Sequence, residues 1–273
     1  NLSMKIISWN VNGIRSNIVC DGKIAASGVS VLDECNMKIL IEKHNPDIIC
    51  IQETKCPIKL GEKICPGCGM YPYKYWNESK GTGHRGTGYS GTSIWSKVKP
   101  LSVSYEYKGL NDSEGRFMYA EFNDFSLINM YVPNSGTNFD YRTQTWDKNI
   151  KEIIDCHMDK PLVITGDFNV VSEASDIWNT TTLDKARSPG AFKEERDMFK
   201  AFLENYTDLY RYMNPDKSEW TWWNMRSRSR DTNKGWRIDY FLLQDKYLDM
   251  VKSCQIDGSI MGSDHCPIIL EIL

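Results

Sequence analysis

The recurrence of short apolar runs that end in acid or amide side chains constrains the fold of this chain most strongly. The clearest example is residues 161–170, Pro-Leu-Val-Ile-Thr-Gly-Asp-Phe-Asn-Val. A short apolar run that leads into glycine is typical of a buried strand. Asp167 and Asn169 follow at its carboxyl end and, two residues apart in an extended segment, point to the same side. Open α/β sheets place ligands at that end of their strands, although an Asx-rich turn after a core strand would have the same sequence.

Polar side chains follow other apolar runs in the same way. These are Asn10 and Asn12, Gln52 and Glu53, Tyr131 and Asn134, Asp239, and Asp264 with His265. Because such groups occur at strand ends throughout the chain and are absent from strand interiors, we expect them to converge on one site.

The order of the elements predicts an α/β fold class. Expected strands cover residues 5–11, 47–53, 92–95, 101–107, 117–122, 125–131, 161–167, 220–223, 238–243, 251–256 and 268–272, and expected helices cover 31–44, 141–157 and 191–206. Residues 16–30, 56–75 and 80–91 look irregular. Strands outnumber helices and occur in hairpins as well as in β-α-β units. This favours a four-layer α/β sandwich, two packed mixed β-sheets flanked by helices, in a single domain over 4–273.

The composition sets outer limits. The chain has 273 residues, of which 41% are apolar and 25% charged, as is ordinary for a globular protein with a sizeable core. No apolar run is long enough to span a membrane, no signal peptide is visible, and we expect Met4 to be the native first residue. The net charge of −3 does not indicate a nucleic-acid partner, but residues 226–237 hold four Arg and one Lys against one Asp. This basic loop suits phosphate, or is a solvated surface loop.

Cysteine usage and ligand types narrow the chemistry. Nine cysteines without a visible signal peptide predict reduced thiols and an intracellular, cytoplasmic or nuclear location. Cys65 and Cys68 form a CxxC motif, which either binds a metal, has a redox role or is simply part of a loop. A zinc site would need a second cysteine pair at ligand spacing, and none is found. The polar strand ends favour a hard cation, Mg²⁺ or Mn²⁺. No GxxxxGK[ST] or GxSxG motif occurs, and a hard-metal site with a His–Asp pair fits hydrolysis of a phosphate ester.

Six motifs in order carry a more specific resemblance. They are Trp-Asn-Val-Asn-Gly at 9–13, Ile-Gln-Glu-Thr-Lys at 51–55, Tyr-Val-Pro-Asn at 131–134, Gly-Asp-Phe-Asn at 166–169, Gly-Trp-Arg-Ile-Asp-Tyr-Phe-Leu at 235–242 and Gly-Ser-Asp-His-Cys-Pro at 262–267. Together they resemble the exonuclease III family of apurinic/apyrimidinic (AP) endonucleases, within the endonuclease/exonuclease/phosphatase superfamily. The resemblance runs from Lys5 to the C-terminus, apart from apparent insertions at about 19–36 and 65–69.

The resemblance implies roles for the polar strand ends. The implied catalytic residues are Asn10, Tyr131, Asp167, Asn169, Asp239 and His265, and the implied metal-site residues are Asn12, Glu53, Asp167, Asn169, Asp264 and His265. Glu53 matches the principal metal carboxylate, and Asp264 would act through water. Asp167 would handle the proton of the attacking water or of the leaving group, while Asp239 and His265 form a dyad that fixes the scissile phosphate. Some members carry Asp at the Asn12 position, so metal affinity here is expected to differ.

A second set of residues is implied for nucleic-acid binding. It comprises Arg15, Lys55, Gly88, Tyr89, Asn134, Trp222, Arg226, Arg228, Arg230, Trp236 and Ile238. Trp222, Trp236 and Ile238 match the pocket for a flipped-out, base-free sugar, whereas Trp220 and Trp223 are expected in the core. The loop at 226–230 lies where the family inserts a side chain into the minor groove.

The resemblance implies a Mg²⁺-dependent AP endonuclease that acts as a monomer on double-stranded DNA. It would cleave 5′ to an abasic site, leave a 3′-hydroxyl and a 5′-deoxyribose phosphate, and have 3′→5′ exonuclease and 3′-phosphodiesterase activities. Two alternatives remain: a superfamily phosphoesterase acting on a lipid or inositol phosphate, and a non-catalytic DNA-binding module. The first would lack the Gly-Trp-Arg-Ile-Asp-Tyr signature, and the second would have lost site residues.

Overall fold

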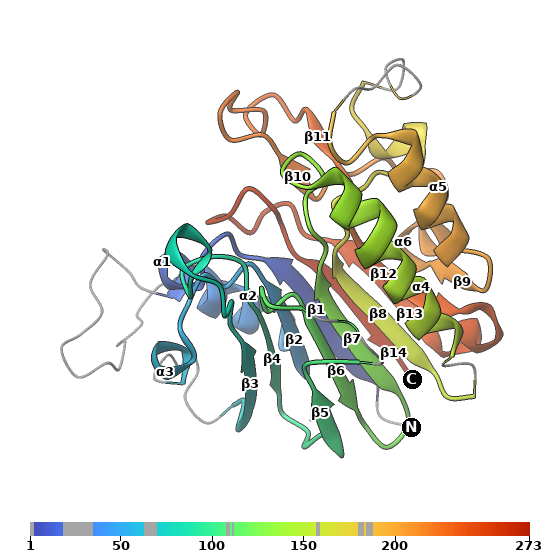
Figure 1. The fold of residues 1–273 in the computed structure, drawn as a ribbon. Coiled ribbons are helices and arrows are strands. Elements are labelled where there is room, and N and C mark those ends of the chain that lie inside the picture. The colour runs from blue at the N-terminus through green and yellow to red at the C-terminus, as the bar shows by residue number, and fades with distance from the viewer. Residues whose placement is uncertain are drawn as a thin grey trace.

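The computed structural model describes residues 3–18, 35–62, 70–107, 110, 112–156, 159–179, 183 and 188–273. Two six-stranded mixed sheets pack face to face within these residues (Figure 1). The first sheet has the order β13 (Val251–Ile256), β14 (Ile268–Ile272), β1 (Met4–Asn10), β2 (Ile48–Gln52), β4 (Thr92–Ser96) and β3 (Tyr73–Asn77). The second has the order β5 (Ser102–Ser104), β6 (Phe117–Glu121), β7 (Ser126–Tyr131), β8 (Leu162–Asp167), β12 (Asp239–Gln244) and β9 (Tyr206–Asp208).

Helices cover the outer faces of the sheets. The α-helices are α1 (Ile14–Ile18), α2 (Asn36–His44), α3 (Ile58–Gly61), α4 (Asp147–Asp155), α5 (Lys193–Phe202) and α6 (Leu209–Met213). The 3₁₀ turns are η2 (Gly83–Arg85), η4 (Ala174–Asp176) and η6 (Asp245–Met250), and η3 (Tyr141–Trp146) is a π-helical turn. A small ribbon of β10 (Trp222–Trp223) and β11 (Gly235–Trp236) stands at one end of the sandwich (Figure 1). The predicted four-layer α/β sandwich is thereby confirmed. No described helix has the length and apolarity needed to cross a lipid bilayer.

The alternation of side chains along each strand builds three apolar layers. Ile6 and Ile48 face the second sheet and pack in the central core. Their neighbours Ile7 and Ile49 point the other way and pack under α2. The second sheet repeats this arrangement, with its outer face packed under α4 and α5. Because a strand exposes alternate residues to opposite faces, apolar runs buried on both sides are what a four-layer fold requires.

Strand register brings the polar strand ends to one edge of the sandwich. In the first sheet, parallel pairing sets Asn10 beside Gln52. In the second sheet, Asp167 is paired with Tyr131 on one side and with Asp239 on the other. A large part of the edge that the sequence pattern predicted is therefore formed by strand ends that are paired in register.

Several element boundaries differ from the sequence expectation. The expected loop at 56–75 contains α3 and leads into β3, and the expected helix at 141–157 begins with the π-helical turn η3. The sequence pattern did not predict β9, α6 and β11. These elements are only two to five residues long, which is too short for a periodic signal. Both apparent insertions and the CxxC motif lie wholly or mostly outside the described residues.

Candidate active site

Asp167 ends β8 at the centre of the site and is almost wholly buried. The preceding Gly166 has a φ of 142°, and a Cβ there would lie 1.8 Å from a β7 carbonyl oxygen, so only glycine fits. The Asp167 carboxylate accepts hydrogen bonds from the Asn10 side chain and the Asn169 backbone, both at 2.9 Å. Burial raises the pKa of Asp167 to about 7, although the His265 charge opposes the rise. Asp167 can therefore exchange a proton near neutral pH.

Asn10 links the two sheets at the site. Its side-chain amide donates to Asp167 Oδ2 at 2.9 Å and to Glu53 Oε2 at 3.0 Å. Asn10 itself is fully buried at the end of β1, so its amide has a fixed position. One amide group therefore aims a carboxylate from each sheet at the same space.

Glu53 follows β2 in a loop whose backbone is strained and firmly held. The φ angle is 55° at Glu53, 49° at Lys55 and 46° at Asn12, all in the left-handed region. Such a conformation costs a non-glycine residue about 1–2 kcal/mol. Hydrogen bonds hold it in place, from Gly13 N to Glu53 O and from Lys55 N to Ser90 O, each 2.8 Å long. Strain of this kind, stabilised by its surroundings, is typical of functional sites.

The Lys55 ammonium occupies the space between two expected metal ligands. Its Nζ lies 3.0 Å from Glu53 Oε1 and donates to Asn12 Oδ1 at 2.7 Å. The Lys55 side chain is 34% exposed and that of Glu53 17%. This half of the site thus holds a positive charge close to solvent.

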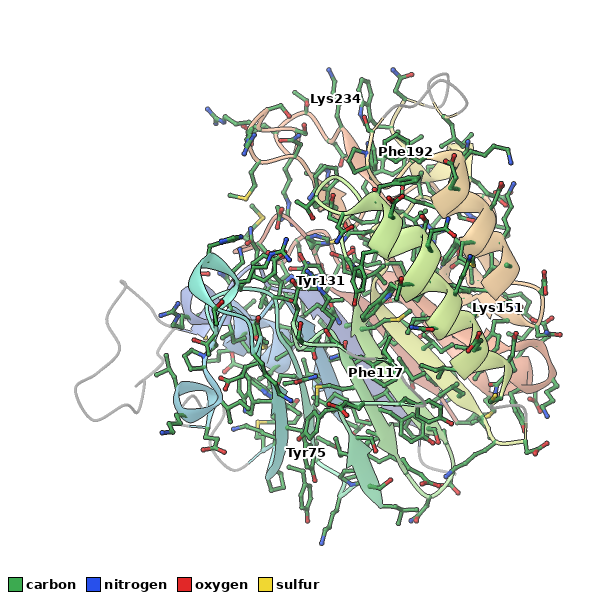
Figure 2. All side chains as sticks on the ribbon, viewed as in Figure 1. Tyr75, Phe117, Tyr131, Lys151, Phe192 and Lys234 are labelled. Carbon is green, nitrogen blue, oxygen red and sulfur yellow. The ribbon has the colours of Figure 1, made fainter. Side chains whose placement is uncertain are left out.

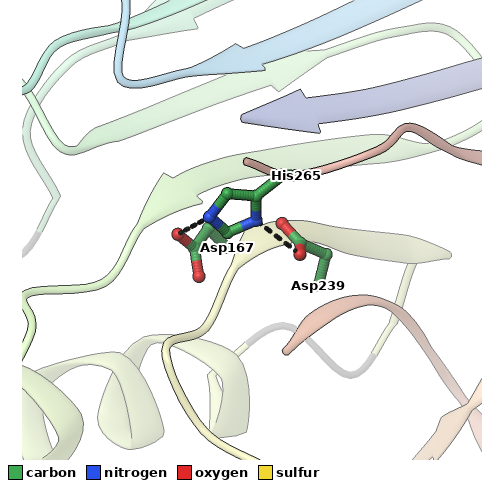
Figure 3. A group of neighbouring side chains, drawn as sticks. All are labelled: Asp167, Asp239 and His265. Atoms are coloured by element: carbon green, nitrogen blue, oxygen red, sulfur yellow. Dashed lines mark hydrogen bonds and ion pairs between the residues drawn. The ribbon is translucent and has the colours of Figure 1, made fainter. Parts of the chain in front are cut away.

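His265 lies between two carboxylates in the buried half (Figure 3). Its Nδ1 is 2.8 Å from Asp239 Oδ2, and its Nε2 is 3.6 Å from Asp167 Oδ2. Burial alone would lower the pKa of His265, but the charges of Asp239 and Asp167 raise it to about 10. The ring is therefore an imidazolium at neutral pH. These three side chains are also the one acid–histidine group, within the described ranges, whose ligand atoms lie close enough together to hold a metal.

Tyr131 ends β7 beside Asp167, at the edge where the sheet ends converge (Figure 2). Burial and the charge of Glu53 raise the pKa of Tyr131 well above its usual value. The Arg116 guanidinium lies 4.6 Å from the ring centroid and donates to the Tyr131 carbonyl at 3.2 Å. The phenol is therefore a protonated hydrogen-bond donor in a fixed orientation at neutral pH.

A cavity of about 260 Å³ opens directly onto these groups. Its lining comprises Glu53, Tyr131, Asn134, Asp167, Asn169, Pro189, Gly190, Trp222, Trp236, Ile238, Asp264 and His265. The rings of Trp222 and Trp236 meet edge to face, with centroids 5.6 Å apart. The Trp222 indole donates to Asp264 Oδ2 at 3.2 Å, which fixes the ring against the acidic side. The cavity thus has one polar wall of ionisable groups and one apolar wall.

Comparison with known proteins agrees with this geometry. The model of the endonuclease/exonuclease/phosphatase family matches residues 7–265. The chain belongs to this family.

Individual relatives are more specific. The chain is 38% identical over 276 residues to "DNA repair nuclease APEX1" of Danio rerio, which covers 98% of this chain and 82% of the relative. It is 34% identical over 279 residues to an exodeoxyribonuclease of Bacillus subtilis, which covers 98% and 99% respectively. The crystal structure of an AP endonuclease from Leishmania major matches with a TM-score of 0.79 at 26% identity and covers 99% of this chain and 87% of that one. The predicted membership of the exonuclease III family is confirmed.

The residues that the family resemblance predicts to contact DNA differ in position and in exposure to solvent. Asn134, Trp222, Trp236 and Ile238 line the cavity itself. Arg15, on α1, and Gly88 are exposed. Tyr89 is half-buried, and its hydroxyl accepts from Arg116 at 3.3 Å. Contact with DNA stays a prediction for all of them.

The three arginines at 226–230 differ in exposure and in the contacts that they form. Arg226 and Arg228 are exposed, although Arg228 pairs with Asp231 at 2.9 Å. Arg230 instead donates to three backbone carbonyls of residues 258–263 and stacks on Trp223 at 4.5 Å. Arg230 therefore fastens the loop to the segment that leads into the Asp264–His265 pair. Trp223 is buried as expected, but Trp220 is only half-buried.

Three features of the site escaped the sequence reasoning. Pro189 and Gly190 line the cavity and were not predicted, and the Pro-Gly dipeptide, typical of a turn, is the one signal that could have indicated them. Arg116 supports Tyr131 from behind, with no motif to suggest it. Lys55, whose contact with DNA stays a prediction, also bonds to Glu53 and Asn12, and no motif indicated these two contacts.

Proposed function

We propose that this protein is a Mg²⁺-dependent AP endonuclease of base-excision repair. It hydrolyses the phosphodiester 5′ to an abasic site in double-stranded DNA and leaves a 3′-hydroxyl and a 5′-deoxyribose phosphate. The observation that carries the proposal is the two-walled cavity, in which groups suited to phosphate hydrolysis face an apolar slot. The curated relatives, named as a DNA repair nuclease and an exodeoxyribonuclease, support it.

The metal fits best at Glu53 and Asn12. Their two oxygens already hold one cation, the Lys55 ammonium, and oxygen donors of this kind suit Mg²⁺ or Mn²⁺. Asp264 would act through water from the cavity wall. His265 is less suited to be a ligand, since a protonated imidazole offers no free lone pair. When bound, Mg²⁺ would supply positive charge that stabilises the phosphate oxygens during hydrolysis.

Proton transfer falls to Asp167. Its pKa of about 7 allows it to accept a proton from the attacking water or to return one to the leaving oxygen. The hydrogen bonds from Asn10 and Asn169, one to each oxygen, fix the carboxylate at the cavity wall. Displacement of such a group by about 1 Å would greatly reduce the rate of hydrolysis.

Two hydrogen-bond donors in fixed positions stabilise the negative charge on the scissile phosphate. The His265 imidazolium is held by Asp239 and presents Nε2 toward Asp167 and the cavity. Tyr131 offers a protonated phenol from the neighbouring strand. Preorganised donors of this kind stabilise developing negative charge without reorganising during the reaction.

The apolar wall gives the preference for damage. Trp222, Trp236 and Ile238 can pack against a bare deoxyribose that has left the helix, while a slot of this size disfavours an attached base. An abasic nucleotide has no base to unstack, so it also leaves the helix at lower cost. Because the catalytic groups face phosphate alone, the same site suits a 3′-terminal nucleotide, which supports 3′→5′ exonuclease and 3′-phosphodiesterase activities.

The two alternatives have less support. A lipid or inositol phosphate phosphoesterase would not need the paired tryptophans beside the phosphate groups. A non-catalytic module would not need to bring Asp167, Asp239 and His265 together. A monomeric state and an intracellular location stay predictions.

The direct test uses a labelled duplex with one tetrahydrofuran abasic analogue and a matched intact duplex. We expect Mg²⁺-dependent nicking 5′ to the analogue, with a 3′ end that a polymerase can extend. A chelator should abolish it. Cleavage of both duplexes at equal rates would overturn the proposed specificity, and the absence of any nicking would overturn the activity.

Trp236→Ala tests the apolar wall separately. Under single-turnover conditions, incision at the analogue should fall while the preference over intact duplex shrinks, because an ordinary flipped nucleotide can then enter. Trp178→Ala is the matched control, since Trp178 is exposed, lies next to β11 and does not line the cavity. Equal reduction of both rates in Trp236→Ala would make Trp236 a structural residue only.

A further inference from the structure

The position of Lys55 raises a problem of space and charge at the proposed metal site. Its ammonium donates to Asn12 Oδ1 at 2.7 Å and lies 3.0 Å from Glu53 Oε1. A divalent ion would need lone pairs of the same two oxygens, at about 2.0–2.1 Å for Mg²⁺. Two cations so close together repel strongly, because the Coulomb energy falls only as the reciprocal of distance. The ammonium and the ion cannot both occupy this space.

The backbone offers no way for the loop to retreat. Glu53 and Lys55 are fixed by hydrogen bonds to Gly13 and Ser90, each 2.8 Å long. The Arg15 guanidinium also donates to the Lys55 carbonyl at 3.4 Å. The Lys55 side chain is 34% exposed and flexible, so it can rotate into solvent while the backbone stays in place.

The direction of that movement leads toward the proposed DNA surface. Lys55 and Arg15 stand on the same loop–helix corner, at the rim next to Asn12. The exposed Met225 also contacts this corner, since the Asn12 amide lies 3.7 Å from its sulfur. A freed ammonium at this corner would meet the phosphates of a bound strand.

We infer that Lys55 is a displaceable cation that couples metal binding to DNA binding. Without a divalent ion its ammonium neutralises Glu53 and satisfies Asn12. When the ion binds, both oxygens coordinate it, and the Lys55 ammonium is released to bind a phosphate of the substrate strand. By linkage, DNA that attracts Lys55 then tightens metal binding by the same factor as the metal tightens DNA binding. The competition rests on the metal site alone, and the coupling rests on the proposed function.

The competition is tested without DNA, by titrating the whole protein with Mn²⁺ and measuring free ion by electron paramagnetic resonance. Lys55→Met should bind Mn²⁺ about fivefold more tightly than wild type, as for loss of a pair worth up to about 1 kcal/mol. Lys55→Arg keeps the charge and should stay near wild type. Lys59→Met, on the exposed face of α3, removes an equal charge away from both oxygens and is the matched control. Unchanged or weaker binding in Lys55→Met would overturn the inference.

The coupling is tested by the affinity for an intact duplex, measured with and without Ca²⁺, with gel analysis to verify that the DNA stays whole. Wild type should gain more affinity from Ca²⁺ than Lys55→Met does, because only wild type has an ammonium to release. Equal gains in the two proteins would overturn the coupling. Since neither measurement depends on incision, failure of the proposed activity would be seen separately in the nicking assay.

Discussion

Two halves of the site each hold a protein cation against oxygen acceptors, and they differ in burial. On the Asp239 side, the His265 side chain is 5% exposed and lies 2.8 Å from its acid. On the Glu53 side, the Lys55 side chain is 34% exposed and forms contacts of similar length. The distances are alike, but the surroundings are not.

The difference teaches that burial decides whether a charge is permanent or replaceable. A buried ion pair cannot lose one partner without leaving an uncompensated charge, which is strongly destabilising. An exposed pair contributes little, since water screens it and can replace either partner. We therefore regard the His265 charge as a fixed part of the catalytic apparatus and the Lys55 charge as a placeholder for an ion.

Asp167→Asn should have the largest effect, because Asp167 contacts both halves through Asn10 and His265. Incision should fall by about 10⁴, the upper end of what acid–base catalysis contributes. Binding of the abasic duplex should be unchanged or tighter, since a negative charge near phosphate is lost. Single-turnover incision and equilibrium binding check this. Near wild-type nicking would mean that the site is centred elsewhere.

Asp239→Asn breaks the fixed half. Turnover should fall by about 10² to 10³, as for other preorganised charges. The pKa of His265 should fall from about 10, because the largest of the charges that raise it is lost while burial still lowers it; NMR of the imidazole measures this. A double variant with His265→Ala should be little worse than either single variant if the two act as one dyad.

The stability of Asp239→Asn should also depend on pH. The folded-state pKa of His265 lies above its ordinary 6.5, so the pair stabilises wild type fully below about pH 6.5. This stabilisation is lost as the pH rises through about 10. Denaturant unfolding of both proteins should therefore show their largest difference at low pH, and a gap that widens with pH would contradict the assignment.

Glu53→Gln alters the replaceable half. The Mg²⁺ concentration for half-maximal activity should rise about tenfold, because one ligand loses its charge. DNA affinity in the absence of metal should not fall, because a negative charge near phosphate is lost and Lys55 is held less firmly. A Mg²⁺ titration of incision measures the first effect, with the exposed Glu62→Gln as control. An unchanged half-saturation point would remove Glu53 from the metal site.

The arginines of the basic loop also differ in burial, and their substitution should have the smallest effect on activity. Neutralising the exposed Arg226 and Arg228 should weaken DNA binding a few-fold across sequences and reduce the salt slope by at most about two units. Arg230→Gln should instead lower the melting temperature, because it releases residues 258–263. Loss of turnover at saturating DNA in the first variant would place the loop inside the catalytic site.

Much of the fold was predictable because buried strands leave a strong signal. The apolar runs before Asn10, Gln52 and Asp167 predicted β1, β2 and β8 to within one or two residues. The convergence of their ends followed from the rule that ligands gather at one edge of an α/β sheet. Roles for individual residues needed the family resemblance, since a strand-end acid alone does not reveal its chemistry.

The remainder depended on contacts that sequence order does not encode. Lys55 reaches Asn12 across 43 positions, and only the left-handed backbone around Glu53 directs it there. Arg116 meets Tyr131 through packing rather than through a motif. No periodic pattern distinguishes Arg230, which is tied down, from Arg228, which is exposed.

The ladder that aligns Tyr131, Asp167 and Asp239 has a consequence for how the protein loses activity. All three residues are paired in register within one sheet, so their relative spacing should be lost only when that sheet opens as a whole. Local fraying of the rim loops would leave their spacing intact. Heat inactivation should then coincide with cooperative unfolding, and partly open forms should either cleave with normal geometry or not at all.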